Sequence, residues 1–383
     1  MIKVIQIKDD AKWDSYVAKH ATSNAYHAFH WQKIIERAYG YKTYALVAVS
    51  HEPASIAEQP EQNVKGILPL VHLKSPFLEN RLVSMPYFDH GGILADNLEC
   101  EKKLIQQAYA LGKRLKAHRI ELRHLAKIAS FENGCSTSDQ NNKVFSEEDI
   151  YLNPSFLKWS LRSHKVRLLL SLPTSSEALF KSFRSKLRSQ INRPIKAGLT
   201  VKIGSMELLN DFYTVFSINM RDLGSPVHAK LLMQCVLEKF DDAARIVMVY
   251  KGDEPVAASL MLGFKDVMIN PWASSLRQHS KESPNMLLYW SMLSYAADQG
   301  YRHFDFGRST PGEGTYRFKT QWGAQPHPMY WYSIWIDQTI KSNEIHSALS
   351  EGKKKAIAAK MWQKLPVPVS RLVGPLIRKH IDL

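Results

Sequence analysis

The first half of the chain carries three apolar runs typical of β-strands, at 44–50, 65–74 and 81–88. A glycine-bearing loop follows them, and a helical stretch then runs from about 98 to 117. The next run, 119–122, again has strand character. The pattern therefore predicts a strand hairpin, a third strand, a helix and a further strand.

The second half of the chain repeats this order. Its segments are the strands 246–250, 256–264 and 267–272, the helix from 284 to about 298, and the strand 302–306. Because the elements follow one another in the same order twice, we predict an internal duplication. The expected fold class is α/β (α+β), with two tandem domains that each hold a mixed, mostly antiparallel sheet flanked by helices.

Composition shifts set the domain boundaries. The segment 130–153 is poor in apolar residues and rich in polar ones, which predicts an exposed, mobile connection, and 52–63 reads as an extended hairpin loop. We place the first domain at 1–164 and the second at 165–337, with a basic tail at 338–383.

The formal charge of +15 favours an anionic partner, such as a phosphate-bearing donor, nucleic acid or an anionic membrane. Charge alone does not choose among these anions, and solubility is the other explanation. Three cysteines lie far apart, which fits reduced thiols and predicts no zinc site. No signal peptide and no membrane-spanning apolar run is seen, so we expect a cytoplasmic protein.

One stretch concentrates this positive charge without any acidic residue. It contains Lys181, Arg184, Lys186, Arg188, Arg193, Lys196 and Lys202. The predicted helix there has an apolar stripe on one side, so several of these cations share the opposite face. The stretch is either a phosphate-binding face, with Arg188 and Arg193 as candidate donor contacts, or a solvated helix surface.

A second candidate for donor binding is the start of the helix at Pro284. Ser283 is expected as its N-cap, with Pro284 at the first helical position. A helix start collects free backbone N–H groups and the positive end of the dipole, which suits phosphate. Lys281, Ser283 and Asn285 are therefore candidate donor-binding residues, and an ordinary capped helix is the alternative.

The segment 304–323 is the richest in candidate chemistry. It joins the strand Phe304–Phe306 to a glycine-punctuated loop that begins at Gly307, and then presents Lys319 between Phe318 and Trp322. A lysine flanked by aromatic rings can be partly desolvated, where its charge acts strongly on a developing oxyanion. Arg308 has the fork geometry that binds carboxylate or phosphate.

Here the sequence resembles a known family. The motif F-D-F-G, a glycine loop and F-K-x-x-W-G at 304–323 resembles the C-terminal signature of the FemAB family and its GNAT-like relatives. The segment 86–92 resembles the P-x-x-x-x-G-G loop of their first lobe, and Trp31 and 68–70 fit their early pattern. The sequence is most similar to the FemAB-like proteins associated with exosortase (PEP-CTERM) exopolysaccharide systems.

The resemblance implies two GNAT-like domains with a cleft between them, and transfer of an acyl or aminoacyl group to an amine. It assigns stabilisation of charge during transfer to Lys319. The donor it implies is acyl-CoA or aminoacyl-tRNA, without a metal. The chain lacks the helical arm inserted in some tRNA-using members.

Further candidates lie within the same two motifs, 86–92 and 304–323. Asp89 and Asp305 are candidate general bases, although Asp305 also reads as a structural residue that ties its strand to the following loop. The candidate substrate-binding residues are Gly307, Arg308, Tyr316, Trp322, Tyr87 and His90. Glu121 and Arg123 alternate with apolar neighbours and so point to the same face of their strand, where they either face the cleft or form an ordinary ion pair.

The sequence therefore predicts an N-acyltransferase that acts on the amine of an amino sugar or a peptide in cell-envelope or exopolysaccharide biosynthesis. The alternatives are an aminoacyl-tRNA-dependent ligase and a non-catalytic module of a polysaccharide assembly complex. The basic tail either contacts an anionic membrane or packs on the second domain.

Overall fold

The computed structural model describes residues 2–8, 10–51, 62–74, 79–132, 157–336 and 351–381. The chain forms two compact units. Unit 1 comprises 1–164, 328–351 and 382–383, and unit 2 comprises 165–327 and 352–381. The predicted mobile segment lies outside the described residues from 133 onward, as does the hairpin loop from 52 to 61.

Unit 1 is built on one mixed sheet. Its strands are β1 (Ile2–Gln6), β2 (Lys42–His51), β3 (Gln62–Leu73), β4 (Arg81–Val83), β5 (Leu94–Ala95), β6 (Arg119–His124), β7 (Trp159–Arg162) and β15 (Tyr330–Trp335). They follow the order β1-β2-β3-β4-β6-β15-β7, with β5 paired to β3. Its helices are α1 (Asp10–Lys19), α2 (His30–Tyr39), α3 (Leu98–Arg114) and α4 (Ala129–Glu132).

Unit 2 has a seven-stranded sheet. Its strands are β8 (Val166–Ser171), β9 (Leu199–Gly204), β10 (Ala244–Lys251), β11 (Glu254–Phe264), β12 (Val267–Ser275), β13 (His303–Ser309) and β14 (Gln325–Pro328). They follow the order β14-β8-β13-β12-β11-β10-β9. Its helices are α6 (Ser176–Ser182), α7 (Ser185–Lys196), α8 (Leu209–Asp222), α9 (Lys230–Phe240), α10 (Pro284–Asp298), α11 (Gly314–Thr320), α13 (Glu351–Gln363) and α14 (Val367–Arg378).

The two sheets have the same plan, which confirms the predicted fold class. Read from β1 and from β9, each sheet runs through three antiparallel strands to a short strand pair that is parallel. A helix, α3 in unit 1 and α10 in unit 2, precedes the second strand of that parallel pair. The repeated order of elements is therefore a repeated architecture.

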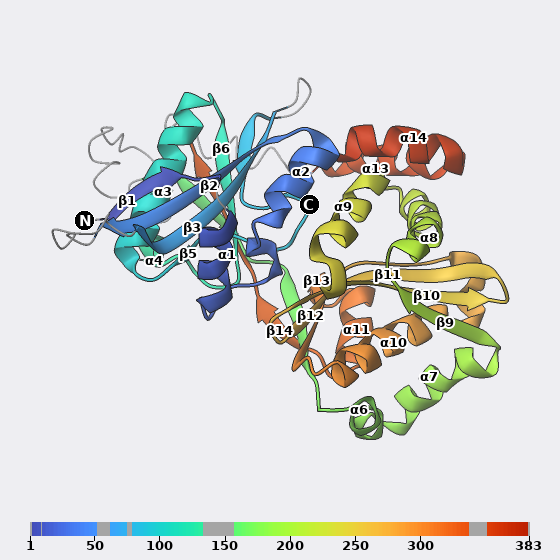
Figure 1. Cartoon of the computed structure of the whole chain (residues 1–383). Helices are drawn as coiled ribbons and strands as arrows, with labels where there is room; N and C mark the ends of the chain where they lie inside the picture. The colour runs from blue at the N-terminus through green and yellow to red at the C-terminus, as the bar shows by residue number, and fades with distance from the viewer. Residues whose placement is uncertain are drawn as a thin grey trace. The chain divides into compact units, whose positions relative to one another are not determined.

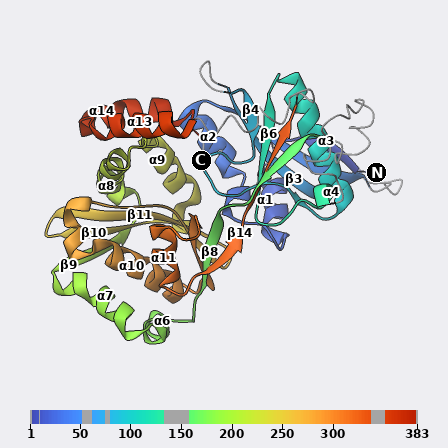
Figure 2. The same ribbon diagram turned by 180° about the vertical axis from the view of Figure 1, so that it is seen from behind.

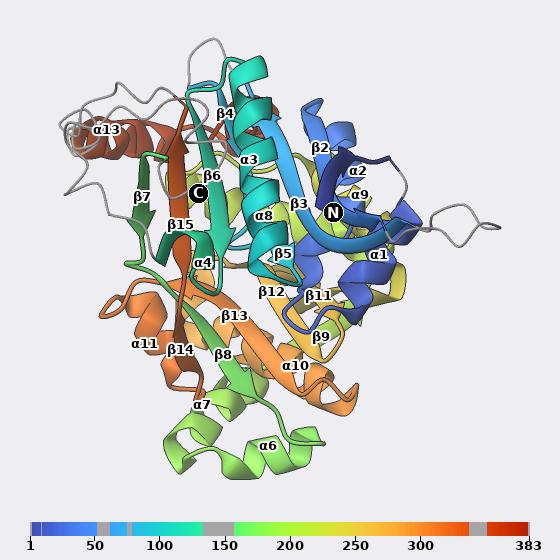
Figure 3. The ribbon, with the colours of Figure 1, turned by 90° about the vertical axis from the view of Figure 1, so that its left-hand side faces the viewer.

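The two units exchange one strand. The strand β8 follows β7 in the chain but pairs with β13 in unit 2, whereas β15 follows β14 but pairs with β6 and β7 in unit 1. Figure 3 shows β15, in the orange-red of the C-terminal part, between β6 and β7. The predicted second domain extended to 337, and this is wrong for β15, because its backbone hydrogen bonds complete the first sheet.

Unit 2 buries its sheet on both faces. Helix α10 packs on one face, together with α6 and α7, and α8 and α9 pack on the other (Figure 1). Strand β11 accordingly has a continuous buried run from Val256 to Gly263. Such a run is typical of a strand that is covered on both sides.

The C-terminal helices α13 and α14 belong to unit 2, so over 352–381 the basic tail packs on the second domain, one of the two alternatives that the sequence left open. Helix α14 packs on α8 with one face that carries Ser370, Gly374 and Arg378, all buried (Figure 2). Nε of Arg378 lies 3.1 Å from Nε2 of His228, and a side chain at Gly374 would collide with Val227. Among the described helices, none is long and apolar enough to cross a membrane.

Candidate active site

The central feature of unit 2 is the place where β12 and β13 part. Their parallel pairing covers only three residue pairs, from Val267–His303 to Ile269–Asp305. Directly beyond it, β12 contains a bulge. Leu260 and Leu262 of β11 pair with Trp272 and Ile269, so Asn270 and Pro271 of β12 lie opposite a single residue of β11. A bulge bends its strand and tolerates proline. The bulge and the end of the pairing therefore coincide where β12 turns away from β13.

A buried polar chain lines this point. The hydroxyl of Ser259 donates to Oδ1 of Asn270 at 2.8 Å, and the Asn270 side chain also hydrogen-bonds to Tyr289 on α10. Burial raises the pKa of the Tyr289 hydroxyl to about 12, although the bond with Asn270 acts in the opposite direction. Tyr289 therefore stays protonated at neutral pH and acts here as a hydrogen-bonding group, not as a base.

Asp305 is the last residue of β13 that pairs with β12, and it is almost completely buried, with 1% of it exposed. Its Oδ2 accepts a hydrogen bond of 2.6 Å from Nε of Arg167 on β8, and its Oδ1 accepts one of 2.8 Å from the backbone N–H of Gly307. Both carboxylate oxygens are thus engaged within the protein. This geometry favours the structural alternative for Asp305 over the general base.

Helix α11 carries Lys319 and is anchored by aromatic rings. Phe318 meets Tyr289 edge-on at 4.9 Å between centroids, and Tyr289 stacks on Phe306 of β13 at 5.6 Å. Lys319 is half-buried, and its Nζ donates to the carbonyl of Arg308 at 2.8 Å. The anchored helix therefore holds the ammonium group against the outgoing end of β13.

The structure brings most other residues of this motif to the same end of β13. Gly307 has φ of +71°, a left-handed conformation that favours glycine. Arg308 and Tyr316 are half-buried and follow it in the strand and in α11. Trp322 differs, because it is buried in the core of unit 2, with 1% of it exposed.

The predicted donor-binding helix start is present, with one correction. Pro284 is the first residue of α10, but Ser283 adopts a left-handed backbone (φ 58°) and its side chain makes no capping bond. Lys281 is exposed, and its carbonyl accepts a hydrogen bond of 2.9 Å from Arg193 of α7. Asn285 is half-buried beside them. The start of α10 therefore lies next to the basic helix α7, on which Arg188 is half-buried.

Three predicted residues, Tyr87, Asp89 and His90, lie in unit 1, in the loop 84–92. Tyr87 and His90 are buried, and Asp89 accepts a bond of 2.9 Å from Nε1 of Trp331 through its carbonyl. Tyr87 has φ of 72°, which is unusual for a bulky residue. The loop is packed, has an unusual backbone conformation at Tyr87 and belongs to unit 1, whereas the Lys319 motif belongs to unit 2.

The loop 84–92 occupies the point in unit 1 at which the parallel strands β4 and β6 stop pairing. There β4 and β6 pair in parallel from Arg81–Arg119 to Val83–Glu121, and then Ser84 N–H donates to the carbonyl of Glu121 at 2.9 Å. The fully buried Arg123 donates to the Phe88 carbonyl at 2.7 Å and to Oε1 of Glu121 at 2.6 Å. The predicted Glu121–Arg123 ion pair therefore exists within β6, and the bond from Arg123 to the Phe88 carbonyl ties the loop to this strand.

Sequence reasoning missed Arg167, Asn270 and Tyr289. Arg167 was not singled out from the sequence, although a lone arginine among Val166, Leu168 and Leu170 indicates a buried carboxylate partner. Asn270 beside Pro271 within a β-prone run is a signal for a bulge. Tyr289 carries no signal of its own within the apolar helix. Among the described residues, no group of three or more potential ligands could hold a metal ion.

Comparisons with known proteins agree with this geometry. The family model for the acetyltransferase (GNAT) domain matches residues 181–320, which run from α6 to α11. A search of curated proteins found no match. These residues thus carry a GNAT acetyltransferase domain, which supports an acyltransferase.

Solved structures share the fold over nearly the whole chain. FemX is similar with a TM-score of 0.60 and 15% identity, over 88% of this chain and 98% of FemX. A tandem GNAT protein from the clavulanic acid biosynthesis pathway gives 0.51 and 9%, over 89% and 100%. The C-terminal domain of a putative lysylphosphatidylglycerol synthetase from Agrobacterium fabrum gives 0.51 and 10%, over 89% and 94%. The fold is therefore a tandem GNAT-like one.

The buried Asp305–Arg167 pair yields a stability prediction. Replacing Asp305 by Asn, or Arg167 by Met, leaves one buried charge without its partner, which typically costs about 3–5 kcal/mol. Urea unfolding of each variant should show a loss of this order. The double variant should lose less than the sum of the two.

The matched control is Glu177→Gln, which breaks the exposed pair of Glu177 with Lys181. An exposed pair of this spacing is worth about 0.5 kcal/mol or less. Equal losses in the control and in the Asp305 variant would contradict the structural role given to Asp305.

Proposed function

We propose that the chain is an N-acyltransferase that moves an acyl or aminoacyl group onto the amine of an amino sugar or a peptide. The observation that supports this most is the parting of β12 and β13 beside the start of α10. Beyond Ile269, the edge of β12 that faces β13 has no pairing partner among the described residues, and α10 begins without a side-chain cap. These features and helix α11, which carries Lys319, all lie in the segment 181–320 that matches the GNAT model. An extended donor with a phosphate group matches these features.

In the proposed reaction the neutral amine attacks the donor carbonyl directly. A C–N bond forms, the C–S bond of a thioester breaks, and the proton released by the amine ends on the leaving thiolate. The ammonium of Lys319 stabilises the negative charge that develops on the carbonyl oxygen, once it exchanges the carbonyl of Arg308 for the substrate. Asp305 positions β13 and takes no proton, because both of its oxygens are occupied.

The context proposed for this activity is cell-envelope or exopolysaccharide biosynthesis of the exosortase (PEP-CTERM) type. It is supported by the FemAB-like motif at 304–323 and by the similarity of fold to FemX. The second candidate is an aminoacyl-tRNA-dependent ligase. Exposed cations at Arg184, Lys186 and Lys196 favour it, because the stretch that contains them has no acidic residue.

The activity is tested by release of free thiol from acyl-CoA donors in the presence of amino sugars or short peptides. Lys319→Ala should lower kcat by about 10²–10³-fold, the range known for loss of one oxyanion-stabilising group. Lys319→Arg should retain part of the activity, because it keeps the charge. Lys239→Ala removes an exposed lysine of α9 and should match the wild type.

A wild-type rate in a folded Lys319→Ala variant would contradict the role of Lys319. Transfer from aminoacyl-tRNA, with no turnover of any acyl-CoA, would instead favour the second candidate. Binding of neither donor would support the non-catalytic alternative.

We further propose that the C-terminal helices contact an anionic membrane surface. Leu372 and Leu376 of α14 are 75% and 61% exposed, and Met361 of α13 is 68% exposed. Lysines at 360, 364 and 379 flank them. The buried face of α14 already packs on α8, so the apolar side chains on its other face form an amphipathic surface with basic edges, which favours anionic lipid.

Vesicle co-sedimentation tests this contact. The protein should sediment with vesicles rich in phosphatidylglycerol and much less with phosphatidylcholine alone. Leu372→Gln combined with Leu376→Gln should abolish most of the binding, whereas Ile203→Gln, at an exposed position on β9, should not. Unchanged sedimentation of the double variant would refute the proposed surface.

A further inference from the structure

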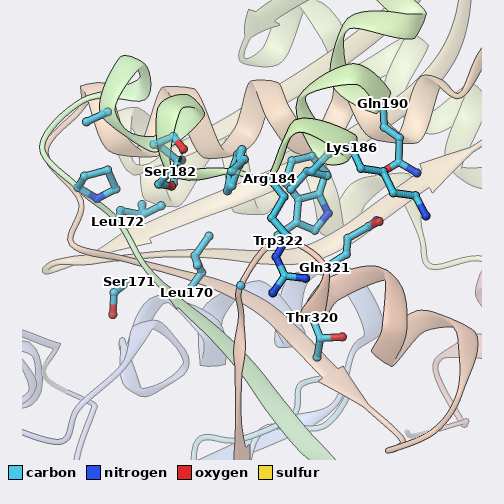
Figure 4. A pocket seen from close by; sticks show the side chains of 16 residues that line it. Leu170, Ser171, Leu172, Ser182, Arg184, Lys186, Gln190, Thr320, Gln321 and Trp322 are labelled. Carbon is cyan, nitrogen blue, oxygen red and sulfur yellow. Dashed lines mark hydrogen bonds between the residues drawn. The ribbon is translucent and has the colours of Figure 1, made fainter.

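Unit 2 contains a cavity of about 790 Å³ that lies apart from the parting of β12 and β13. Its lining comes from β8 and the turn after it, from α6 and α7, and from the segment 320–323 (Figure 4). No lining residue belongs to β12, β13 or α10. The volume is typical of a site for a small ligand. The cavity is therefore a candidate for a second ligand, distinct from the acyl donor.

One end of this cavity is apolar. Leu170 and Leu172 of the β8 segment lie there, and Leu179 of α6 forms part of the wall. Figure 4 shows Leu170 and Leu172 at the side opposite to Lys186 and Gln190. Removal of such a surface from water favours a ligand with an apolar chain, by roughly 25 cal/mol for each Å² covered.

The other end is cationic. Arg184 and Lys186 line it and are exposed, and neither side chain has an ion-pair partner among the described residues. No acidic residue lines the cavity. Arg184 is also the N-cap of the twelve-residue helix α7, which has no side-chain cap at this end. The positive end of the helix dipole therefore adds to the two side-chain charges and favours an anion.

A buried donor points to the same ligand group. Nε1 of Trp322 is buried and has no hydrogen-bond partner among the described residues, although the indole lines the cavity. A buried donor without an acceptor costs about 1–3 kcal/mol. Figure 4 shows the indole at the end where Arg184, Lys186 and Gln321 lie. An anionic oxygen bound there would supply the missing acceptor.

We propose that this cavity binds an amphipathic anion. Its carboxylate or phosphate head lies against Arg184, Lys186 and Nε1 of Trp322, and its apolar chain extends toward Leu170 and Leu172. The proposal does not depend on acyl transfer from acyl-CoA, because the cavity and the proposed reaction site share no strand or helix wall other than the end of α11. A tRNA donor would instead compete with the anion for Arg184 and Lys186.

Calorimetric titration of the full chain with three ligands of equal chain length tests the head group. Dodecanoate and dodecyl phosphate, below their micelle concentrations, should bind at one site, and dodecyltrimethylammonium should not. The tighter of the two anions identifies the head as a carboxylate or as a phosphate. Equal binding of the cationic ligand would overturn the proposal.

Variants test the location. Arg184→Ala combined with Lys186→Ala should weaken binding of the anions by tenfold or more, about 1.4 kcal/mol. Lys196→Ala, an exposed lysine of α7 that does not line the cavity, is the matched control. The same affinity in the double variant and in this control would refute the site.

Trp322→Phe tests the contact with Nε1. It removes the indole donor and also shortens a side chain that packs on Phe183 and Phe318 in the core, so the melting temperature without ligand should fall. Affinity of the folded variant for the anion should fall roughly tenfold as well, because the hydrogen bond to the head is lost. Unchanged affinity in the folded variant would refute the contact between Nε1 and the anionic head.

Discussion

The short parallel strand pair, closed by a buried carboxylate, is the constraint on which both units depend. In unit 2 the pair ends at Asp305, and in unit 1 it ends at Glu121. Each acid is 2% exposed or less and is held by an arginine at hydrogen-bonding distance, Arg167 and Arg123 respectively. A buried carboxylate is tolerated only when it is paired. In unit 1, Arg123 lies on β6 together with Glu121 and joins that strand to the loop 84–92 through the Phe88 carbonyl. In unit 2, Arg167 comes from β8, the strand that is exchanged between the units, and joins it to β13.

The same constraint leads to different outcomes in the two units. In unit 1 the loop 84–92 closes the parting, because its backbone bonds to β6 and its Phe88 carbonyl receives Arg123. In unit 2 the bulge at Asn270 turns β12 away, and among the described residues β13 gives it no further backbone partner. The first unit thus closes this point with a packed loop, whereas in the second unit the edge of β12 has no backbone partner there among the described residues. This asymmetry is why we propose that the chemistry takes place in unit 2.

Much of the fold follows from the sequence because strand and helix order depends on local periodicity. The duplicated order at 44–122 and 246–306 predicts both sheets, and Gly307 and Pro284 mark real local constraints. The exchange of β8 and β15 is not predictable in this way, because a strand's partner is set by packing far away in sequence. Ser283 was misjudged for a related reason: its left-handed backbone, set by the preceding turn, prevents the cap that its residue type favours. Asp305 could be read as catalytic or structural until its partner, Arg167, was known.

Hydrogen–deuterium exchange of the full chain with and without donor tests the central claim most directly. Saturating acyl-CoA, or aminoacyl-tRNA for the alternative donor, should slow exchange at 270–275 of β12 and in the first turn of α10. The loop 84–92 and β6 should exchange at the same rate in both states. Slowed exchange confined to unit 1, or no change with either donor, would contradict the assignment of donor binding to the parting of β12 and β13.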